Sequence, residues 1–358
     1  MNKKTLLLAL VLAGVACHKN NNNNGPTTQT LNANFVQTNL VSDTTSYGAA
    51  NIDASLLNGW GIAVNPSAAI IWVSANHSGS SDVYDSTGKT LFGPVDIISM
   101  KMNHGGSPSG VAFNPTNDFT IPGESAADKF VFVNEDGTIS GWPLGAPATN
   151  TVVDKSSFNA VYKGCAFGVQ GGNTYFYAAN FRENSIDVFD KNWQDVSSFA
   201  FRDAAIPAGF GPFNIANIGG MLYVTYAKLK GPDNEDDDPA PGNGYLDIYS
   251  TDGKLVKKFA SGGTLNSPWG MAQAPALSGL PLHAILVGNF GDGRINVYDS
   301  TGVFLGPLQG NGQPIVIDGL WALDFPINEN PAFGPQKLYF TAGPKDEQHG
   351  LFGYLKNQ

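Results

Sequence analysis

The segment Trp60-Gly61-Ile62-Ala63-Val64, in which a small residue precedes apolar ones, recurs along the chain at regular intervals. The other copies are Ser109-Gly110-Val111-Ala112-Phe113, Lys163-Gly164-Cys165-Ala166-Phe167, Phe213-Asn214-Ile215-Ala216, Trp269-Gly270-Met271-Ala272 and Trp321-Ala322-Leu323-Asp324-Phe325. Counted from Gly61 to Ala322, successive copies are 49 to 56 residues apart. A period of this length is typical of repeat proteins in which each copy is one supersecondary unit.

Each copy is followed by further strand-like segments. The second segment is rich in aromatic and β-branched residues, as in 70–76, and a third follows, as in 186–190. A weaker fourth segment, such as 90–98, precedes the next copy. Six repeats of four strands predict an all-β fold, a six-bladed β-propeller over residues 33–358. A β-sandwich followed by a second β-domain is the alternative, which six in-phase repeats disfavour.

The last repeat stops after its third strand, near Tyr354-Leu355. The segment Phe35–Ser42 lies before the first repeat and has strand composition. We expect it to supply the missing fourth strand, because pairing with the final blade closes the ring and removes an open sheet edge.

The composition supports a β-rich domain and excludes several other classes. Hydrophobic residues make up 42% of the 358 residues and charged residues only 14%, with 43 Gly and 22 Pro. This is unlike a coiled coil or a charged disordered protein. The formal net charge is −10 and no basic stripe is visible, so we expect no nucleic-acid partner.

The amino-terminal region has the features of an export signal. Residues 1–16 begin with Lys3 and Lys4 and continue with a short apolar run, too short to span a bilayer. Cys17 follows Gly14-Val15-Ala16, a pattern similar to a bacterial lipobox, with Gly14 where Leu is usual. We therefore expect a lipid anchor on Cys17 and a disordered tether over 17–32. The expected location is the bacterial cell envelope, and the membrane contact is through the lipid only.

Several strings of the chain match a known kind of propeller. They are Asn39-Leu40-Val41-Ser42-Asp43, Trp60-Gly61-Ile62-Ala63, residues 289–299, Leu338-Tyr339-Phe340-Thr341-Ala342-Gly343-Pro344 and His349-Gly350-Leu351-Phe352-Gly353. On these strings the chain resembles NHL-type six-bladed propellers, and more narrowly a family of exported bacterial propeller proteins of unknown function. The resemblance covers about residues 35–355. It implies the propeller fold and export, and it transfers no catalytic residues.

Candidate ligands for a metal stand where the second strands end. The connections from second to third and from fourth to first strands open on one face of a propeller, where loops from every blade converge. Carboxamide and carboxylate oxygens there could bind Ca²⁺, as in calcium-dependent lactonase propellers. The candidates are Asn76, Asn134, Asn180, Asn289, Glu135 and Asp292. The alternative is that each Asn only ends its strand by bonding its own turn.

Three histidines are expected on the same face. His77, His104 and His349 fall in loops of consecutive blades, and with Asp346 or Glu347 they could hold a transition metal or act as a general base. The alternative is that they are unrelated surface histidines.

Four further residues begin first strands and are candidates for ligand binding. Trp60, Trp269 and Trp321 could stack on a sugar or another flat ligand, or else pack in the core. Lys163 takes the same place in the third repeat, where a lysine indicates a wet, open channel mouth.

The longest insertion, residues 228–244, contains Asp233-Asn234-Glu235-Asp236-Asp237-Asp238. Like charges repel, so we expect an extended loop unless a cation or a basic partner neutralises it. A weak Ca²⁺ site is one reading of this run, and a solvated loop is the other.

The functional prediction is a binding scaffold at the cell envelope, for a small ligand or an envelope protein that the sequence does not identify. The alternative is an enzyme, a Ca²⁺-dependent hydrolase, lactonase or lyase at the channel mouth. No Walker loop, Gly-x-Ser-x-Gly turn or His-Glu-x-x-His helix is present.

Overall fold

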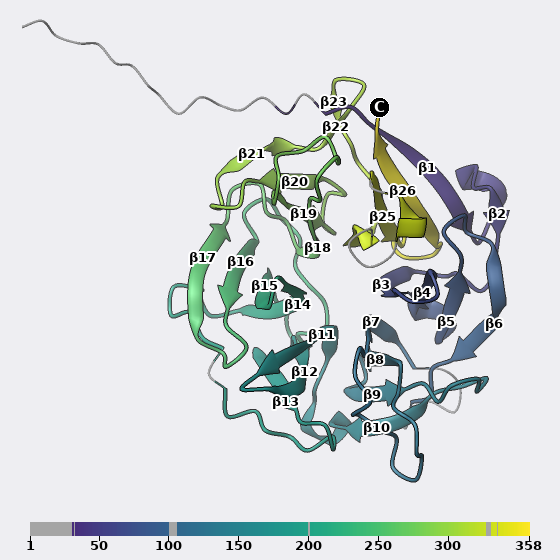
Figure 1. Cartoon of the computed structure of the whole chain (residues 1–358). Coiled ribbons are helices and arrows are strands. Elements are labelled where there is room, and N and C mark those ends of the chain that lie inside the picture. The colour runs from purple at the N-terminus through teal and green to yellow at the C-terminus, as the bar shows by residue number, and fades with distance from the viewer. Residues whose placement is uncertain (1–30, 32, 100–105, 200, 327–330, 335) are drawn as a thin grey trace, which may run out of the picture.

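Six blades, each formed by one β-sheet, stand around a central axis in the computed structural model (Figure 1). The structure describes residue 31 and residues 33–99, 106–199, 201–326, 331–334 and 336–358. The export signal, Cys17, the tether and His104 lie outside the described residues. The all-β, six-bladed propeller predicted from the repeats is confirmed.

The innermost strand of each blade coincides with a copy of the sequence repeat. These first strands, for blades one to six, are β3 (Gly59–Asn65), β7 (Pro108–Phe113), β11 (Tyr162–Gln170), β14 (Phe210–Ile218), β18 (Pro268–Gln273) and β24 (Leu320–Asp324). The second strands are β4 (Ile70–Ala75), β8 (Phe130–Asn134), β12 (Asn173–Asn180), β15 (Met221–Lys228), β19 (Ile285–Asn289) and β25 (Lys337–Ala342). In every blade the first and second strands are antiparallel.

The outer strands complete the blades. The third strands are β5 (Ser80–Tyr84), β9 (Thr138–Gly141), β13 (Ser185–Phe189), β16 (Gly244–Tyr249), β20 (Ile295–Tyr298) and β26 (Leu351–Asn357). The fourth strands are β6 (Thr90–Asp96), β10 (Asn150–Asp154), β17 (Leu255–Ser261) and β21 (Phe304–Pro307). Blade three has three strands in its described sheet, where the repeat predicted four. There the Val196 N–H donates to Val188 O at 2.8 Å, and the Val188 N–H donates to the Ser197 hydroxyl rather than to a backbone carbonyl.

The ring is closed by β1 (Phe35–Ser42), as the sequence predicted. This strand pairs antiparallel with β26, with Phe35 opposite Asn357 and Ser42 opposite Leu351. A short strand, β2 (Asn51–Ile52), lies parallel to β1 on its outer side. The sixth sheet therefore joins both ends of the described chain, and the two strands lie side by side in Figure 1.

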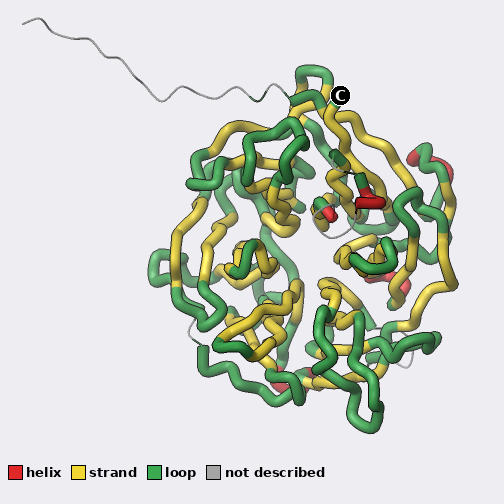
Figure 2. Tube along the Cα trace, in the orientation of Figure 1, coloured by secondary structure: helices red, strands yellow, loops and turns green. Residues whose placement is uncertain are grey.

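The connections are loops and short turns. Figure 2 shows only brief helical segments among strands and loops. They include the 3₁₀ turns η1 (Thr45–Tyr47), η2 (Asn76–Ser78), η3 (Ser156–Phe158) and η5 (Pro331–Phe333), and a small hairpin is formed by β22 (Gln309–Gly310) and β23 (Gln313–Pro314). Within the described part of the chain, no helix has the length and apolarity needed to cross a membrane.

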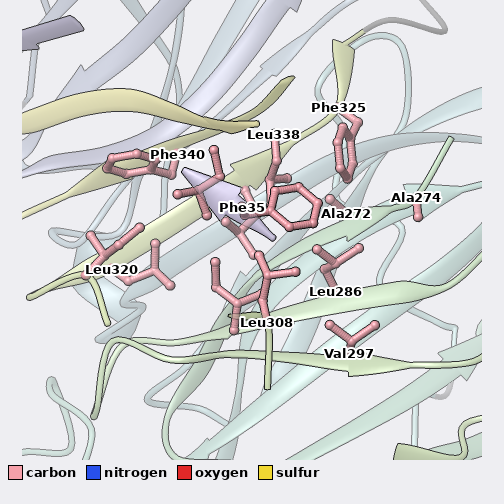
Figure 3. Packing of buried hydrophobic residues seen from close by; sticks show 14 of the residues in the cluster. Phe35, Ala272, Ala274, Leu286, Val297, Leu308, Leu320, Phe325, Leu338 and Phe340 are labelled. Atoms are coloured by element: carbon pink, nitrogen blue, oxygen red, sulfur yellow. The ribbon is translucent and has the colours of Figure 1, made fainter. Parts of the chain in front are cut away.

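Separate hydrophobic cores lie between neighbouring blades. The core at the ring closure packs Phe35 of β1 against residues of blades five and six, including Leu286, Leu308 and Phe340 (Figure 3). Phe35 is only 2% exposed. The closing strand is therefore bound by side-chain packing as well as by backbone pairing.

The small residue of the repeat is needed because neighbouring first strands come close together at the axis. A Cβ atom on Gly61 would lie 2.6 Å from the Ser109 carbonyl oxygen, and one on Gly270 would lie 2.5 Å from that of Trp321. Ser109 and Trp321 each belong to the first strand of the next blade. Glycine at these positions lets adjacent first strands approach around the axis.

Candidate functional site

The tryptophans that begin first strands meet at the axis. Trp60 and Trp321 stack with ring centroids 3.7 Å apart, and Trp269 lies edge-on to Trp60 at 6.4 Å. Phe290 stacks on Trp321 at 3.9 Å, and Phe213 lies 5.9 Å from it. We call these five residues the central aromatic cluster.

Contacts within this cluster join blades that are not neighbours. Trp60 belongs to blade one and Trp269 to blade five, while Phe213 of blade four contacts Trp321 of blade six. Side chains therefore fill the channel at this level. The open channel mouth that we expected from Lys163 is not present here. The three tryptophans are 1–4% exposed, which leaves little ring surface for stacking on a ligand.

Beyond this cluster the first strands enclose a cavity of about 550 Å³. Its apolar lining includes Ile62, Val111, Phe167, Met271 and Leu323. These residues come from five blades, and the cavity extends to residues that follow the ends of the first strands. It lies on the face opposite the predicted site.

Lys163 lies beside the central aromatic cluster, and its side chain is 3% exposed. Its ammonium group forms an ion pair with Glu135, lies 3.9 Å from Asp236 Oδ1 and sits 5.1 Å above the Trp60 ring. Its backbone carbonyl accepts a hydrogen bond from Trp269 Nε1 at 3.1 Å. Lys163 thus connects groups from blades one to five.

The charge of Lys163 is decided by its partners. Burial alone lowers the pKa of this lysine, but the charge and hydrogen bond of Glu135, with smaller effects from Asp236 and Asp237, raise the pKa above its ordinary value. Lys163 is therefore a protonated ammonium group at neutral pH. It is a poor candidate for a catalytic base.

A chain of hydrogen bonds continues from Glu135 across the mouth. Asn76 Nδ2 donates to Glu135 Oε2 at 2.9 Å, and Asn58 Nδ2 donates to Asn76 Oδ1 at 3.5 Å. Trp321 Nε1 donates to Asn58 Oδ1 at 2.9 Å. This chain holds Glu135 in place and connects Lys163 to the opposite side of the ring.

Glu347, on an unusual turn of blade six, lies near Glu135 and Lys163. Lys345, Asp346 and Glu347 have φ values of 56°, 52° and 65°, three left-handed residues in succession. The left-handed conformation costs a residue other than glycine about 1–2 kcal/mol. Strain of this kind concentrates at functional sites.

The electrostatics of Glu347 also indicate a functional position. Burial, followed by repulsion from Glu135, raises the pKa of Glu347 to about 7, with Lys163 opposing the change. Its Oε2 atom lies 3.9 Å from Nε2 of His77. Perturbed acids of this kind cluster at functional sites.

The acidic insertion of blade four folds over the mouth, and the protein's own cations neutralise it. Arg182 pairs with Glu235 and donates to the Asp233 carbonyl oxygen at 2.9 Å. Lys228 pairs with Asp238 at 2.7 Å. No external cation is needed to explain why the loop is not extended.

Asp237 is the buried carboxylate of this insertion. It is 8% exposed, and its Oδ2 atom has no hydrogen-bond partner among the described residues. Burial raises its pKa, and the hydroxyl of Ser267 and then the charge of Lys163 act against that rise. We call Glu135, Lys163, Asp236, Asp237 and Glu347 the mouth cluster, with His77 at its rim.

The comparisons with known proteins identify relatives but not an activity. No family model matches the chain. It is 35% identical over 323 residues to uncharacterized protein L690 of Acanthamoeba polyphaga mimivirus, covering 86% of this chain and 82% of the relative. It is 33% identical over 332 residues to uncharacterized protein R648 of the same virus, covering 88% and 78%. The chain belongs to the family of these two viral proteins.

This family has a propeller fold related to solved structures. A streptogramin B lyase structure aligns with a TM-score of 0.50 and 11% identity, covering 91% of this chain and 98% of that one. This likeness shows the fold alone, a β-propeller. The sequence led us to expect a bacterial family. These two relatives are viral proteins instead.

The asparagines predicted as calcium ligands mostly brace their own loops. Asn180 Oδ1 accepts from the Val161 N–H at 3.2 Å, just before the first strand of its blade. Asn289 Oδ1 accepts from the Asn266 N–H at 3.2 Å, and its Nδ2 donates to Asp292 at 3.1 Å. Asn134 donates to Thr138 Oγ1 at 3.1 Å within its hairpin. These contacts match the structural alternative.

Of the predicted calcium ligands, the structure brings together Asn76 and Glu135. Within the described ranges, no group of three or more His, Cys, Asp or Glu side chains has a spacing suited to a metal ion. A calcium site made by the four asparagines remains a prediction that these contacts do not favour.

The two predicted site histidines that the structure describes have different acidic partners. His77 faces Glu347, whereas His349 Nδ1 lies 2.7 Å from Asp43 Oδ2 and its ring packs on Tyr47. The structure therefore places His77 beside the mouth cluster and His349 beside an acidic residue that follows the closing strand.

Sequence reasoning named Lys163, Glu135, Glu347 and the acidic run 233–238, but as parts of separate candidate sites. Lys163 was visible because other repeats have Trp, Phe or Ser at its position. The gathering of Asp236, Asp237 and Glu347 around Lys163 had no sequence signal, since they reach it only through the geometry of the ring.

Proposed function

We propose that this protein is a binding protein whose mouth cluster receives a ligand through a cationic group, such as an ammonium or guanidinium group. The observation that carries this proposal is the convergence of Glu135, Asp236, Asp237 and Glu347, from blades two, four and six, around one buried ammonium group. The carboxylates outnumber the cation. Asp237 also retains an unpartnered buried oxygen.

Charge favours a cationic ligand over a neutral or anionic one. Field lines concentrate in a concave site lined by one sign of charge, so such a site attracts the opposite charge. The formal net charge of −10 adds to this attraction. The central aromatic cluster closes the channel beneath the site, so the ligand would bind at the mouth without passing through.

We test this proposal with an acetylated, amidated trilysine peptide, measured by calorimetry. The lysine side chains stay charged from pH 6 to 8. As pH rises through about 7, Glu347 loses its proton and the mouth becomes more negative. We therefore expect tighter binding at pH 8 than at pH 6, and Glu347→Gln should weaken binding and remove this pH dependence.

The matched control is Asp118→Asn, which removes an exposed carboxylate between β7 and β8, on the opposite face. It should leave binding unchanged. Equal weakening by both variants would mean a general charge effect, and the absence of saturable binding by wild type would overturn the proposal.

The export and anchoring inferred from residues 1–16 and Cys17 belong to the same proposal. A lipid on Cys17 would place the binding domain at an envelope surface, on a tether of residues 17–32. Expression in a bacterial host should give a detergent-phase protein with an acylated amino terminus. Cys17→Ser should move it to the aqueous phase, and an unchanged partition would contradict the anchor.

A second candidate function is acid–base catalysis, as in a lyase or hydrolase. It is favoured by Glu347, whose pKa of about 7 suits a general base and which faces His77. In an elimination, Glu347 would take a proton from carbon while the leaving group departs with its bonding electrons and a proton from His77. A solved propeller of similar fold is a streptogramin B lyase, although that likeness shows the fold alone.

A panel of lactones and cyclic esters distinguishes catalysis from binding. Turnover that is lost in Glu347→Gln but retained in Asp118→Asn would establish the enzyme. Trilysine binding without turnover would leave the binding protein as the function.

A further inference from the structure

The cavity that the first strands enclose beyond the central aromatic cluster is separate from the mouth cluster. Its volume of about 550 Å³ lies within the range of about 300–1,000 Å³ that is usual for small-molecule sites. Trp269 and Ala322 line it and belong to the hydrophobic cluster that fills the axis. Its lining also includes Pro115, Asn217 and Gly219, which are exposed. The cavity is therefore closed toward the mouth and open on the opposite face.

The side chains of this lining offer a ligand mainly apolar contact. Asn214 Nδ2 donates to the Trp269 carbonyl oxygen at 2.9 Å, and Asn217 Nδ2 donates to that of Phe167 at 2.9 Å. The side-chain oxygen of each asparagine accepts a backbone N–H. Because these carboxamides already have partners in the protein, buried apolar surface would supply most of the affinity.

The charge of the lining indicates an uncharged ligand. Asp324 is the charged residue in the described part of this lining, and it ends β24 at the open side of the cavity. Its carboxylate repels an anion, and the formal net charge of −10 adds to that repulsion. An ion would also lose its hydration among apolar side chains. Gln273, which ends β18 at the same opening, is a neutral hydrogen-bonding group for the polar end of a ligand.

The proportions of the cavity indicate a compact molecule. The lining follows β18 from Trp269 to Gln273, a depth of about 13 Å at about 3.3 Å per residue. Over this depth the volume of about 550 Å³ gives a mean cross-section of about 40 Å². One extended hydrocarbon chain is thinner than this, whereas an aromatic or fused-ring body would fill it.

Apolar side chains continue from the lining onto the surrounding surface. Val169 is exposed two residues after Phe167 on β11, and side chains two apart on a strand lie on the same face. Met221 is exposed two residues after Gly219, and Leu277 is exposed in the loop that follows β18. Apolar residues gathered on one face mark binding sites more often than scattered ones do. An apolar ligand would therefore meet favourable surface before it enters the cavity.

We infer that this cavity is a second binding site, which takes an uncharged aromatic or fused-ring molecule, with its apolar body against Trp269 and Met271 and its polar end at Gln273 and Asp324. The site is independent of the mouth cluster, because the central aromatic cluster lies between them. Its ligand and the cationic ligand proposed for the mouth would bind on opposite faces.

The test uses two dyes that share one skeleton and differ in charge. N-phenylnaphthylamine is uncharged, and anilinonaphthalenesulfonate has the same skeleton with an added sulfonate. Fluorescence titration measures both dyes with wild type, Ala216→Phe and Ala112→Phe, which enlarge small lining residues of blades four and two. Ala54→Phe is the matched control, at an exposed position before β3. A second pair is Asp324→Asn and Asp118→Asn, the latter at an exposed carboxylate on the same face but outside the lining.

We expect wild type to bind about one equivalent of N-phenylnaphthylamine and to bind the sulfonate at least about tenfold more weakly. Ala216→Phe and Ala112→Phe should each weaken binding of the uncharged dye at least about tenfold, whereas Ala54→Phe should bind it as wild type does. Asp324→Asn should strengthen binding of the sulfonate about threefold and leave the uncharged dye unchanged. Asp118→Asn should change neither.

Three results would overturn the inference. One is the absence of saturable binding of the uncharged dye by wild type, and another is equal binding of the two dyes by wild type; neither measurement requires a variant to fold. The third is undiminished binding of the uncharged dye by Ala216→Phe and Ala112→Phe proteins that thermal unfolding shows to be folded. An equal gain of sulfonate binding in Asp324→Asn and Asp118→Asn would overturn the role of Asp324.

Discussion

The indole rings of Trp60 and Trp321 lie 3.7 Å apart at an interplanar angle of 17°, although the two residues begin the first strands of blades one and six. Phe290 covers the other face of Trp321. This contact connects the first and last blades at the axis. The stability of the ring should therefore depend strongly on Trp321.

Trp321→Ala should lower the free energy of unfolding by about 3–5 kcal/mol, because it removes a large buried ring and leaves a cavity. It also removes the donor to Asn58 Oδ1. Urea unfolding measures the change. Leu144→Ala, at a residue 75% exposed, is the control and should change stability by less than about 0.5 kcal/mol. Similar losses in both variants would contradict the packing role.

Gly61→Ala should destabilise the protein by about 1–3 kcal/mol, because the added methyl group would overlap the Ser109 carbonyl of the next blade. Gly93→Ala is a matched control in β6, where an added Cβ meets nothing within 4 Å. Thermal unfolding of the two variants separates axial crowding from the general effect of losing a glycine. A stable Gly61→Ala protein would show that the first strands can move apart.

Phe35→Ala should cost about 3–5 kcal/mol, because Phe35 fills the core between blades five and six. Ile52→Ala is the control from the same sheet, since Ile52 is 51% exposed on the outermost strand. Hydrogen exchange of β26 amides should also accelerate in Phe35→Ala. Unchanged protection there would argue against β1 as the strand that closes the ring.

Asp82→Asn should stabilise the protein above neutral pH. Burial, with repulsion from Asp53, raises the pKa of Asp82 to about 7 in the folded state, against 3.8 ordinarily. The folded state therefore binds this proton more tightly, so stability falls as pH rises from about 4 to 7. The folded-state pKa is about three units above the ordinary one, so the free energy of unfolding changes by on the order of 2–4 kcal/mol over this pH range.

The measurement for Asp82 is the urea midpoint at pH 5 and pH 8. Wild type should be less stable at pH 8, and Asp82→Asn should reduce that difference, whereas Asp118→Asn at the surface should not. A larger pH dependence in Asp82→Asn than in wild type would show that the carboxylate is stabilising.

Much of the fold could be predicted because the repeat has a direct physical cause. Small residues such as Gly61 and Gly270 recur where first strands approach one another, and apolar strands follow each of them. The closing strand could be predicted because the final repeat lacks a fourth strand. The irregular edge of blade three could not, since its outer segment makes a side-chain contact through Ser197 in place of a regular ladder.

The candidate site was only partly predictable. Lys163 breaks the pattern of its repeat and was visible for that reason. Glu347 was predicted only as a partner of the histidines, because its approach to Lys163 depends on a left-handed turn that no local residue preference indicates. Asp237 is buried only because the insertion folds over the mouth. The asparagines were visible as a pattern, but Asn180 and Asn289 repeat because each braces its own loop.

The pairing of β1 with β26 also constrains how the protein is made. Domains begin to form while the ribosome is still adding residues. Here β1 is synthesised more than 300 residues before its partner β26. Phe35 and Leu40 stay unpaired until β26 has been made, so the nascent chain carries an exposed apolar strand that a chaperone would be well placed to shield.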